Sequence, residues 1–179
     1  MQYHYTDTEI KRLLDSLTVI IDSREQENTH VTSYFDRQKI PFQTKKLDFG
    51  DYCPMLPANT ELGILRDVYF GNSLAIERKA SLEELSGNFT QDRTRFEQEL
   101  IRASKAKLFL MVENSSYADI VGHKYRTQYE PKAFLATLKT YEARHGLDVN
   151  FVPASHAGNF IFYTFYYHVR EFLKGGGVI

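Results

Sequence analysis

Short apolar runs alternate with longer segments of helical periodicity, and this alternation constrains the fold more than any other feature of the chain. Val19–Ile21, Leu74–Ile76 and Leu108–Val112 have the length and the side chains of buried strands. Between and after them, apolar residues recur at spacings of three and four, as in amphipathic helices. Strands that alternate with helices predict an α/β domain in which helices flank a central mixed β-sheet.

Several predicted elements begin or end at residues that favour helix termini. Thr6 can cap a helix over Asp7–Ser16, and Pro131 and Gly146 mark the start and the end of a longer helix. Further helices are expected over 31–38, 81–85, 92–105 and 159–174, with a break near 87–88, and further strands over 42–47 and 149–152. Because residues 42–76 have no helical pattern, we expect antiparallel strands there, joined by a loop over 54–73.

Composition and charge exclude several classes of protein. The formal net charge of −1 argues against a protein that coats DNA through general basicity. No apolar run reaches the roughly 18 residues that a membrane span needs, and residues 1–17 are too polar for a secretory signal. The single cysteine, Cys53, excludes an internal disulfide and fits a reducing compartment. We therefore expect a cytoplasmic protein that does not bind membranes.

Charged residues gather at the ends of the predicted strands and at one turn. In chain order they are Asp22, Gly50-Asp51, Glu77-Arg78-Lys79 and, one helical turn later, Glu83. Because side chains two residues apart in a strand point to the same face, Glu77 and Lys79 should share a side while Arg78 faces the other way.

A carboxylate and an ammonium group side by side at the end of a buried strand are costly unless they are paired or used. Phosphodiester hydrolysis uses both groups. Carboxylates bind Mg²⁺, which polarises a phosphate, and a lysine can stabilise the negative charge that develops. Asp51 and Glu77 are therefore candidate metal ligands, and Asp22 could support the metal.

Each of these features also has a purely structural interpretation. A carboxylate two residues before a lysine is commonly a solvated strand edge, and Gly-Asp is commonly a turn. Asp22 could cap the turn that follows it, and Glu83 could be an ordinary acid in the first turn of a helix. Their joint occurrence, in order, favours the functional interpretation.

The ordered set Asp22-Ser-Arg-Glu25, Gly50-Asp51 and Glu77-Arg-Lys79 resembles the XPF-type nuclease family, whose signature is GD followed by ERKxxxD. The resemblance covers about Val19 to Val112 and implies a restriction-endonuclease-like fold. It implies that Asp51 and Glu77 bind Mg²⁺ or Mn²⁺ and that Lys79 assists the attack. The family's first-strand acid corresponds to Asp22, its arginine to Arg78, and its final aspartate to Glu83, where this chain has the longer acid. The resemblance therefore implies that Glu83 is a further metal ligand.

The resemblance also implies how the chain is organised. We expect one nuclease domain over 1–179, with an N-terminal helix over 1–17, a catalytic core over 18–112, and elements over 113–174 that complete the domain. No Gly-x-x-x-x-Gly-Lys-Ser/Thr loop is present, so we expect no nucleotide cofactor. The sequence also lacks the glycine pattern of a helix-hairpin-helix domain.

Basic residues outside the motif are candidates for contacts with DNA phosphates. The predicted DNA-binding residues are Arg24, Arg93, Arg95, Lys124 and Arg126. A stripe on the last predicted helix, Tyr163, Tyr167 and Arg170, could form a homodimer interface. The structural alternative for each set is a solvated helix face.

Three functions follow from these observations. The leading hypothesis is a DNA endonuclease that requires Mg²⁺ or Mn²⁺ and acts on branched or flap structures. The second is a restriction-type or junction-resolving nuclease on the same fold. The third is a DNA-binding module without activity, which the intact set of acids at Asp51 and Glu77 argues against.

Overall fold

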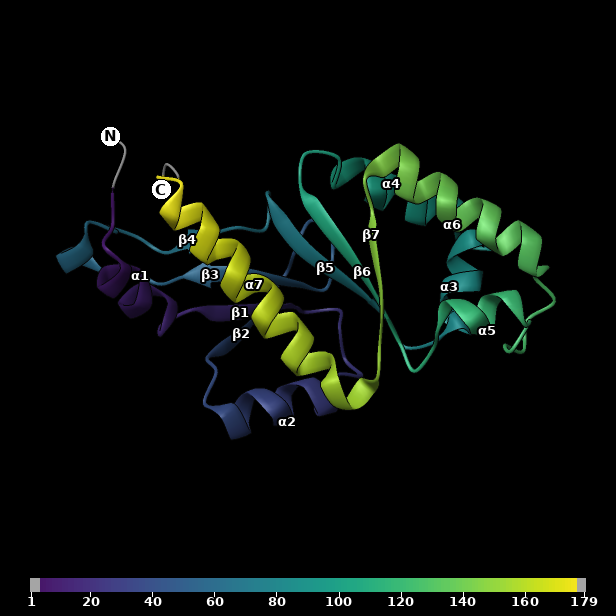
Figure 1. Ribbon diagram of the computed structural model, residues 1–179, viewed down its shortest axis with the longest axis horizontal. Coiled ribbons are helices and arrows are strands. Elements are labelled where there is room, and N and C mark those ends of the chain that lie inside the picture. The colour runs from purple at the N-terminus through teal and green to yellow at the C-terminus, as the bar shows by residue number, and fades with distance from the viewer. Residues whose placement is uncertain (1–3, 177–179) are drawn as a thin grey trace.

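The computed structural model describes residues 4–176, and one β-sheet runs through it with helices on both faces (Figure 1). The helices are α1 (Asp7–Leu14), α2 (Thr29–Gln38), α3 (Leu82–Phe89), α4 (Arg93–Arg102), α5 (Tyr117–Val121), α6 (Pro131–His145) and α7 (Ala157–Lys174), with 3₁₀ turns at Thr60–Leu62 and Ala154–His156. The strands are β1 (Thr18–Asp22), β2 (Phe42–Lys45), β3 (Tyr52–Leu56), β4 (Val68–Tyr69), β5 (Leu74–Lys79), β6 (Lys107–Glu113) and β7 (Asp148–Val152).

The sheet is mixed, as the sequence predicts. Its order is β2-β1-β3-β5-β6-β7, with β4 paired to β3. Strands β5, β6 and β7 are parallel, whereas β3 is antiparallel to β1, β4 and β5. The prediction of antiparallel strands over 42–76 is wrong for β2, which pairs parallel with β1 because α2 returns the chain to the same end of the sheet. Residues 54–56 also belong to β3 and not to a loop.

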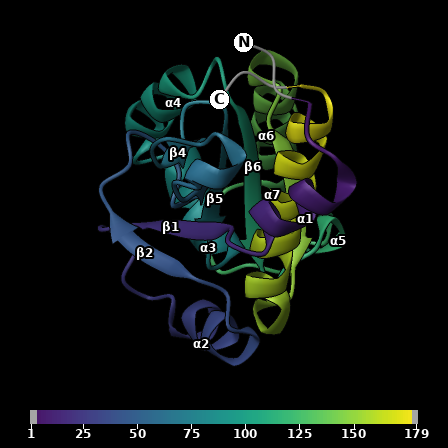
Figure 2. The same ribbon diagram turned by 90° about the vertical axis from the view of Figure 1, so that its left-hand side faces the viewer.

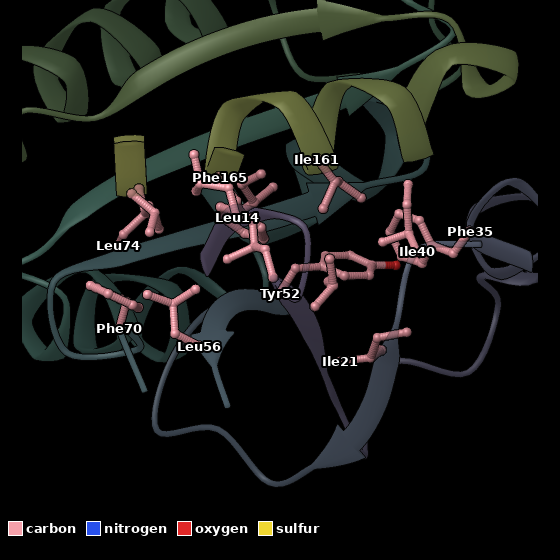
Figure 3. Close-up of a cluster of buried hydrophobic side chains, with 14 of the residues drawn as sticks. Leu14, Ile21, Phe35, Ile40, Tyr52, Leu56, Phe70, Leu74, Ile161 and Phe165 are labelled. Carbon is pink, nitrogen blue, oxygen red and sulfur yellow. The ribbon is translucent and has the colours of Figure 1, made fainter. Parts of the chain in front are cut away.

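Two hydrophobic cores lie on opposite faces of the sheet, and β5 contributes to both. Leu74 and Ile76 pack with α1, α2 and α7, and Figure 3 shows Leu74 in that cluster with Tyr52 and Phe165. Ala75 packs on the other face with α3, α4 and α6. In Figure 2, α1 and α7 lie side by side, and α4 lies on the opposite side of β5. The side-chain alternation of β5 therefore decides which charged residues face which helices.

The helix boundaries follow local signals with one exception. Thr6 and Glu9 form a reciprocal capping box at α1, and Gly146 ends α6 in the left-handed region at φ 63°. The predicted break between two helices is present, but it lies at 90–92 and not near 87–88, because α3 continues to Phe89, whose ring packs against Tyr141 in the core. No helix in residues 4–176 has the length and apolarity that crossing a membrane requires.

Candidate active site

A glycine turn places Asp51 beside the end of β5. Gly50 has a φ of +68°, and a Cβ there would lie 3.0 Å from the Ala75 Cβ, so only glycine fits without strain. The Asp51 N–H donates to the Ile76 carbonyl at 2.8 Å, and Asp51 Oδ2 accepts the Arg78 backbone N–H at 2.8 Å. The turn thus fixes the Asp51 carboxylate against the strand that carries Glu77.

Glu77 and Lys79 lie on the same face of β5, as the two-residue period predicts. Both are buried, and Lys79 Nζ donates to Glu77 Oε1 at 2.5 Å. The second oxygen, Glu77 Oε2, is buried and has no hydrogen-bond partner within the described chain. An unpartnered buried carboxylate oxygen costs about 1–3 kcal/mol or more, so Glu77 Oε2 is an acceptor that is free to bind a cation.

The environment of Asp51 and Glu77 disfavours the ionisation of both carboxylates. Burial raises the pKa of Glu77, the Asp51 charge raises it further, and Lys79 opposes both. Burial also raises the pKa of Asp51 to about 7, against the opposing hydrogen bond from the Arg78 amide. Strongly raised carboxylate pKa values beside a buried lysine are typical of functional sites.

Glu77 and Lys79 open into a pocket of about 330 Å³ between β5, α3 and α4. We call it the carboxylate pocket; it is lined by Glu77, Lys79, Glu84, Gly87, Asn88, Asp92, Arg95, Phe96 and Glu99. Lys79 Nζ lies 5.4 Å from the centre of the Phe96 ring. The pocket therefore combines acids with an ammonium group and one arginine.

Three acids that line this pocket, Glu84, Asp92 and Glu99, were missed by the sequence reasoning, and two of them contact the residues of the site. Glu84 Oε1 lies 3.7 Å from Lys79 Nζ, while its Oε2 accepts the Ala80 N–H at 2.8 Å. Glu99 accepts the Gly50 N–H at 3.1 Å and so links α4 to the turn that holds Asp51. Glu84 could have been found from the apolar stripe of α3, which sets the rotation of the helix, whereas no local signal marks Glu99.

Glu83, predicted as a metal ligand, is not part of the carboxylate pocket. Its Oε1 accepts the Arg126 backbone N–H at 3.0 Å, and it lines a separate pocket with Ser86 and Thr127. Successive residues of a helix are rotated by about 100°. That rotation turns Glu83 toward Arg126 and leaves the adjacent Glu84 beside Lys79.

The carboxylate of Asp22 makes hydrogen bonds to the turn that follows it and to the loop that precedes Asp51. Asp22 Oδ1 accepts the Arg24 backbone N–H at 2.7 Å, both carboxylate oxygens bond the Arg24 guanidinium, and Oδ2 accepts the Leu47 N–H at 2.9 Å. Burial raises the pKa of Asp22, but these hydrogen bonds outweigh it and leave the pKa below the ordinary value. Both oxygens are occupied, so the structural interpretation, a cap for the following turn, describes Asp22 better than a metal ligand.

Arg78 faces away from the carboxylate pocket, as the strand period predicts. Its Nε and Nη2 donate to the two oxygens of Glu113 at 2.7 and 2.9 Å, and its Nη1 donates to Glu25 at 2.9 Å. His30 also contacts Glu113, at 2.8 Å. Only the backbone N–H of Arg78 reaches the site, through Asp51, so the predicted catalytic role of its side chain could be exerted only indirectly.

The residues present fit a hard divalent cation. Within residues 4–176, no three Asp, Glu, His or Cys side chains stand together as a ready metal cage. Mg²⁺, however, keeps several waters and is commonly bound by one or two carboxylates plus substrate phosphates. Asp51 and the free Oε2 of Glu77 supply that number of protein ligands.

The predicted DNA-binding residues divide into two groups. The first group lies near the candidate site: Arg95 lines the carboxylate pocket, and Arg24 interacts electrostatically with the carboxylates of Asp51 and Glu99. Arg93 is exposed and pairs with Glu97 at 3.0 Å, away from the pocket lining. The second group is Lys124 and Arg126, both exposed on the segment that contacts Glu83.

Comparison with known proteins agrees with this geometry. The model of the ERCC4 domain matches residues 21–163. The chain belongs to the ERCC4 domain family. Two solved structures have the same fold: XPF from Aeropyrum pernix, at 21% identity and a TM-score of 0.61 over 90% of this chain, and XPF from Aeropyrum pernix in complex with DNA, at 17% identity and 0.59 over 86%. The chain spans 64% and 65% of those two proteins. No curated protein matches the sequence.

Membership of the ERCC4 family confirms the resemblance drawn from Gly50-Asp51 and Glu77-Arg-Lys79, and both motifs lie inside the matched segment. The fold is therefore that of an XPF-type nuclease domain.

Proposed function

We propose that the protein is a DNA endonuclease that depends on Mg²⁺ or Mn²⁺, with Asp51 and Glu77 as its metal ligands and Lys79 as its third catalytic group. The observation that carries the proposal is the buried, unpartnered Oε2 of Glu77 beside a buried lysine. A divalent cation bound there would polarise a scissile phosphate.

Lys79 serves as a fixed positive charge and not as a base. Burial lowers the pKa of Lys79, but the carboxylates of Glu77, Asp51 and Glu84 together raise it by more, so the net pKa is above the ordinary value. The ammonium group therefore stays protonated at neutral pH. It can donate a hydrogen bond to a phosphate oxygen and stabilise the charge that develops in the transition state.

Glu84 and Glu99 have supporting roles in this proposal. Glu84 and Glu77 both form ion pairs with Lys79, and the Glu84 carboxylate holds the ammonium group at the edge of the carboxylate pocket. Glu99 holds the Gly50 amide and, through that turn, the direction of Asp51. Arg95 lines the same pocket and can neutralise a neighbouring phosphate.

DNA as the substrate is supported by the family and by the XPF structure solved with DNA. A preference for branched or flap DNA belongs to the same proposal. A homodimer is proposed through the exposed face of α7, where Tyr163 and Tyr167 are 45% and 55% exposed and stack on each other. Beside them lies a hollow of about 350 Å³ that also borders α1 and α2.

The test is cleavage of labelled flap DNA with Mg²⁺, with Mn²⁺ and with excess chelator. The parent should cut only with metal, and Asp51→Asn and Glu77→Gln should not cut. Glu83→Gln is the matched control, because Glu83 is an acid next to the site that lies outside the pocket. Calorimetric titration of Mn²⁺ adds a measurement without DNA. Cleavage in chelator, or by both site variants, would overturn the proposal.

A further inference from the structure

A second concave surface lies on the same face of the sheet as the carboxylate pocket. We call this surface, which has a volume of about 460 Å³, the lysine groove. The residues that line it include Lys45, Lys46, Leu47, Cys53, Tyr69 and Asn72. Its floor is Cys53 of β3, which forms a small cluster with Ile20 of β1 and Met55 of β3, and Leu47 packs against that cluster. No other partly buried hydrophobic residue of the described chain packs on that cluster.

The strand register shows that the groove and the carboxylate pocket share one face. Tyr52 of β3 pairs with Ile76 of β5, and both side chains point to the α7 core. Cys53 and Glu77, one residue further along each strand, therefore point to the opposite face. Residues 46–50 form the wall between the two hollows: Leu47 packs over the groove floor, and Phe49 packs into the core behind the pocket.

Basic groups surround this wall. Arg24 Nη2 donates to the Leu47 carbonyl at 2.9 Å, and Arg102 Nε donates to the Asp48 carbonyl at 3.1 Å. Lys45 and Lys46 stand at its start and are exposed. The nearby acids are Asp22, which Arg24 neutralises, the exposed Asp48, and, at the far end of the wall, Asp51 and Glu99, which accepts the Gly50 N–H. Positive charge therefore gathers at the start of the wall, where Lys45 and Lys46 face the groove with only Asp48 beside them, and phosphate binding requires such a local patch.

Tyr69 adds an aromatic ring to the lysine groove. Its side chain belongs to β4 and is 41% exposed. Lys45 Nζ lies 2.5 Å from the Tyr69 hydroxyl and 4.1 Å from the centre of its ring, so the ring and the ammonium group are held together. A concave groove that combines lysines with an exposed aromatic ring is the pattern by which proteins bind single strands. Duplex DNA instead receives protruding elements into its own grooves.

We propose that the lysine groove binds the single-stranded arm of a branched DNA substrate. Lys45 and Lys46 contact its phosphates, the exposed part of the Tyr69 ring stacks on a base, and the strand crosses the 46–50 wall to reach Asp51 and Glu77. The inference rests on the proposed endonuclease function. It adds the part of the substrate that is recognised and the residues that recognise it.

The experiment measures binding by fluorescence anisotropy, with Ca²⁺ in place of Mg²⁺ to slow cleavage. The probes are a duplex with a single-stranded oligothymidine arm and the same duplex without an arm. The variants are Lys45→Ala/Lys46→Ala and Tyr69→Leu. Lys132→Ala/Lys139→Ala is the matched control, because it removes two exposed lysines of α6 that lie outside both hollows. Circular dichroism melts show that each variant is folded.

The expected result is specific to the arm. Each single-strand phosphate contact contributes about 0.7 to the slope of log Kd against log salt, so Lys45→Ala/Lys46→Ala should lower that slope by about 1.4 on the armed probe. Tyr69→Leu should raise Kd for the armed probe at least about fivefold, the low end for one stacked base. Neither change should affect the armless duplex, and the control variant should match the parent.

Two outcomes would overturn the inference alone. One is an unchanged salt slope with the armed probe, and the other is an equal loss on both probes, which would make the groove a duplex surface. In either case the parent still cuts DNA and the proposed function stands. A parent that neither binds nor cuts any DNA would instead remove the proposed function itself.

Discussion

Glu113→Gln is the most informative single change, because Glu113 holds Arg78 of β5 on the face opposite the candidate site. The substitution keeps the shape of the side chain but removes the charge that two Arg78 nitrogens share. The Arg78 guanidinium would lose its main partner in a buried position. Because the Arg78 backbone N–H donates to Asp51 at 2.8 Å, any movement of Arg78 is transmitted to the proposed metal ligand.

The magnitude follows from burial. Glu113 is 2% exposed and Arg78 is 8% exposed, and removal of one partner from a buried pair costs about 3–5 kcal/mol. Arg78 keeps its contact with Glu25, and glutamine keeps one acceptor oxygen, so we expect a loss of about 2–3 kcal/mol. For a domain of this size, that loss lowers the melting temperature by roughly 4–12 °C.

The assay is thermal denaturation at pH 7, together with steady-state cleavage of flap DNA well below the melting temperature. Glu171→Gln is the control, because it breaks the Arg170–Glu171 pair, whose acid is 66% exposed, and should cost less than about 1 kcal/mol. Burial raises the pKa of Glu113, but Arg78 and His30 outweigh it and hold the pKa below the ordinary value. The stabilising charge is therefore present at pH 7 and lost as the pH falls through that depressed pKa, so parent and variant should converge in acid.

Kinetics separate a positioning effect from simple destabilisation. If Arg78 positions Asp51, the folded variant should show a lower kcat with little change in KM, and it should need more Mg²⁺ for half-maximal rate. A variant that melts within about 2 °C of the parent would contradict the reasoning on burial. A normal metal requirement and kcat would contradict the link from Arg78 to Asp51.

Three further predictions concern the site itself. Lys79→Ala should lower kcat more than it raises KM, because the ammonium charge acts on the transition state; steady-state kinetics showing only a KM effect would contradict this. Mg²⁺ should raise the melting temperature more at pH 8 than at pH 5.5: burial raises the pKa of Asp51 to about 7, so metal-free stability falls as the pH rises toward 7, and bound metal relieves this penalty. Equal shifts in scanning fluorimetry would count against Asp51 as a ligand. Glu84→Gln should raise the Mg²⁺ concentration needed for half-maximal cleavage, whereas Glu83→Gln should leave the metal titration superimposable on that of the parent.

The fold was predictable where apolar residues recur with the period of a strand or a helix. Five of the strands and the long helices follow from apolar runs and spacings, and the alternation along β5 correctly places Glu77 and Lys79 opposite Arg78. The partner of β2 was not predictable, because parallel pairing with β1 depends on how α2 returns the chain. The five-residue helix α5 is too short to show a period, although Ser116 caps it.

The placement of the candidate site residues was predictable where the backbone conformation alone determines it. Gly50 and Asp51 follow from a turn that only glycine accommodates, and Glu77 and Lys79 follow from the strand. Asp22 was uncertain because its role depends on bonds to Arg24 and to Leu47, 25 residues away. No local rule reports a hydrogen bond that the loop makes only after folding.

Glu83 and Glu84 show that the position of an acid in a motif is weaker evidence for the direction of its side chain than the residue at which the helix begins. Counting residues from Glu77 assigns the final acid of the motif to Glu83. The N-cap of α3 is Ser81, and its buried stripe of Leu82, Leu85 and Phe89 sets the rotation of the helix. With that rotation, Glu84 faces Lys79 and Glu83 faces Arg126. A carboxylate in the first turn is favoured by the helix dipole at either position, so stability does not choose between them. The choice is made by the apolar stripe, and the acid beside Lys79 is therefore one residue later than the motif implies.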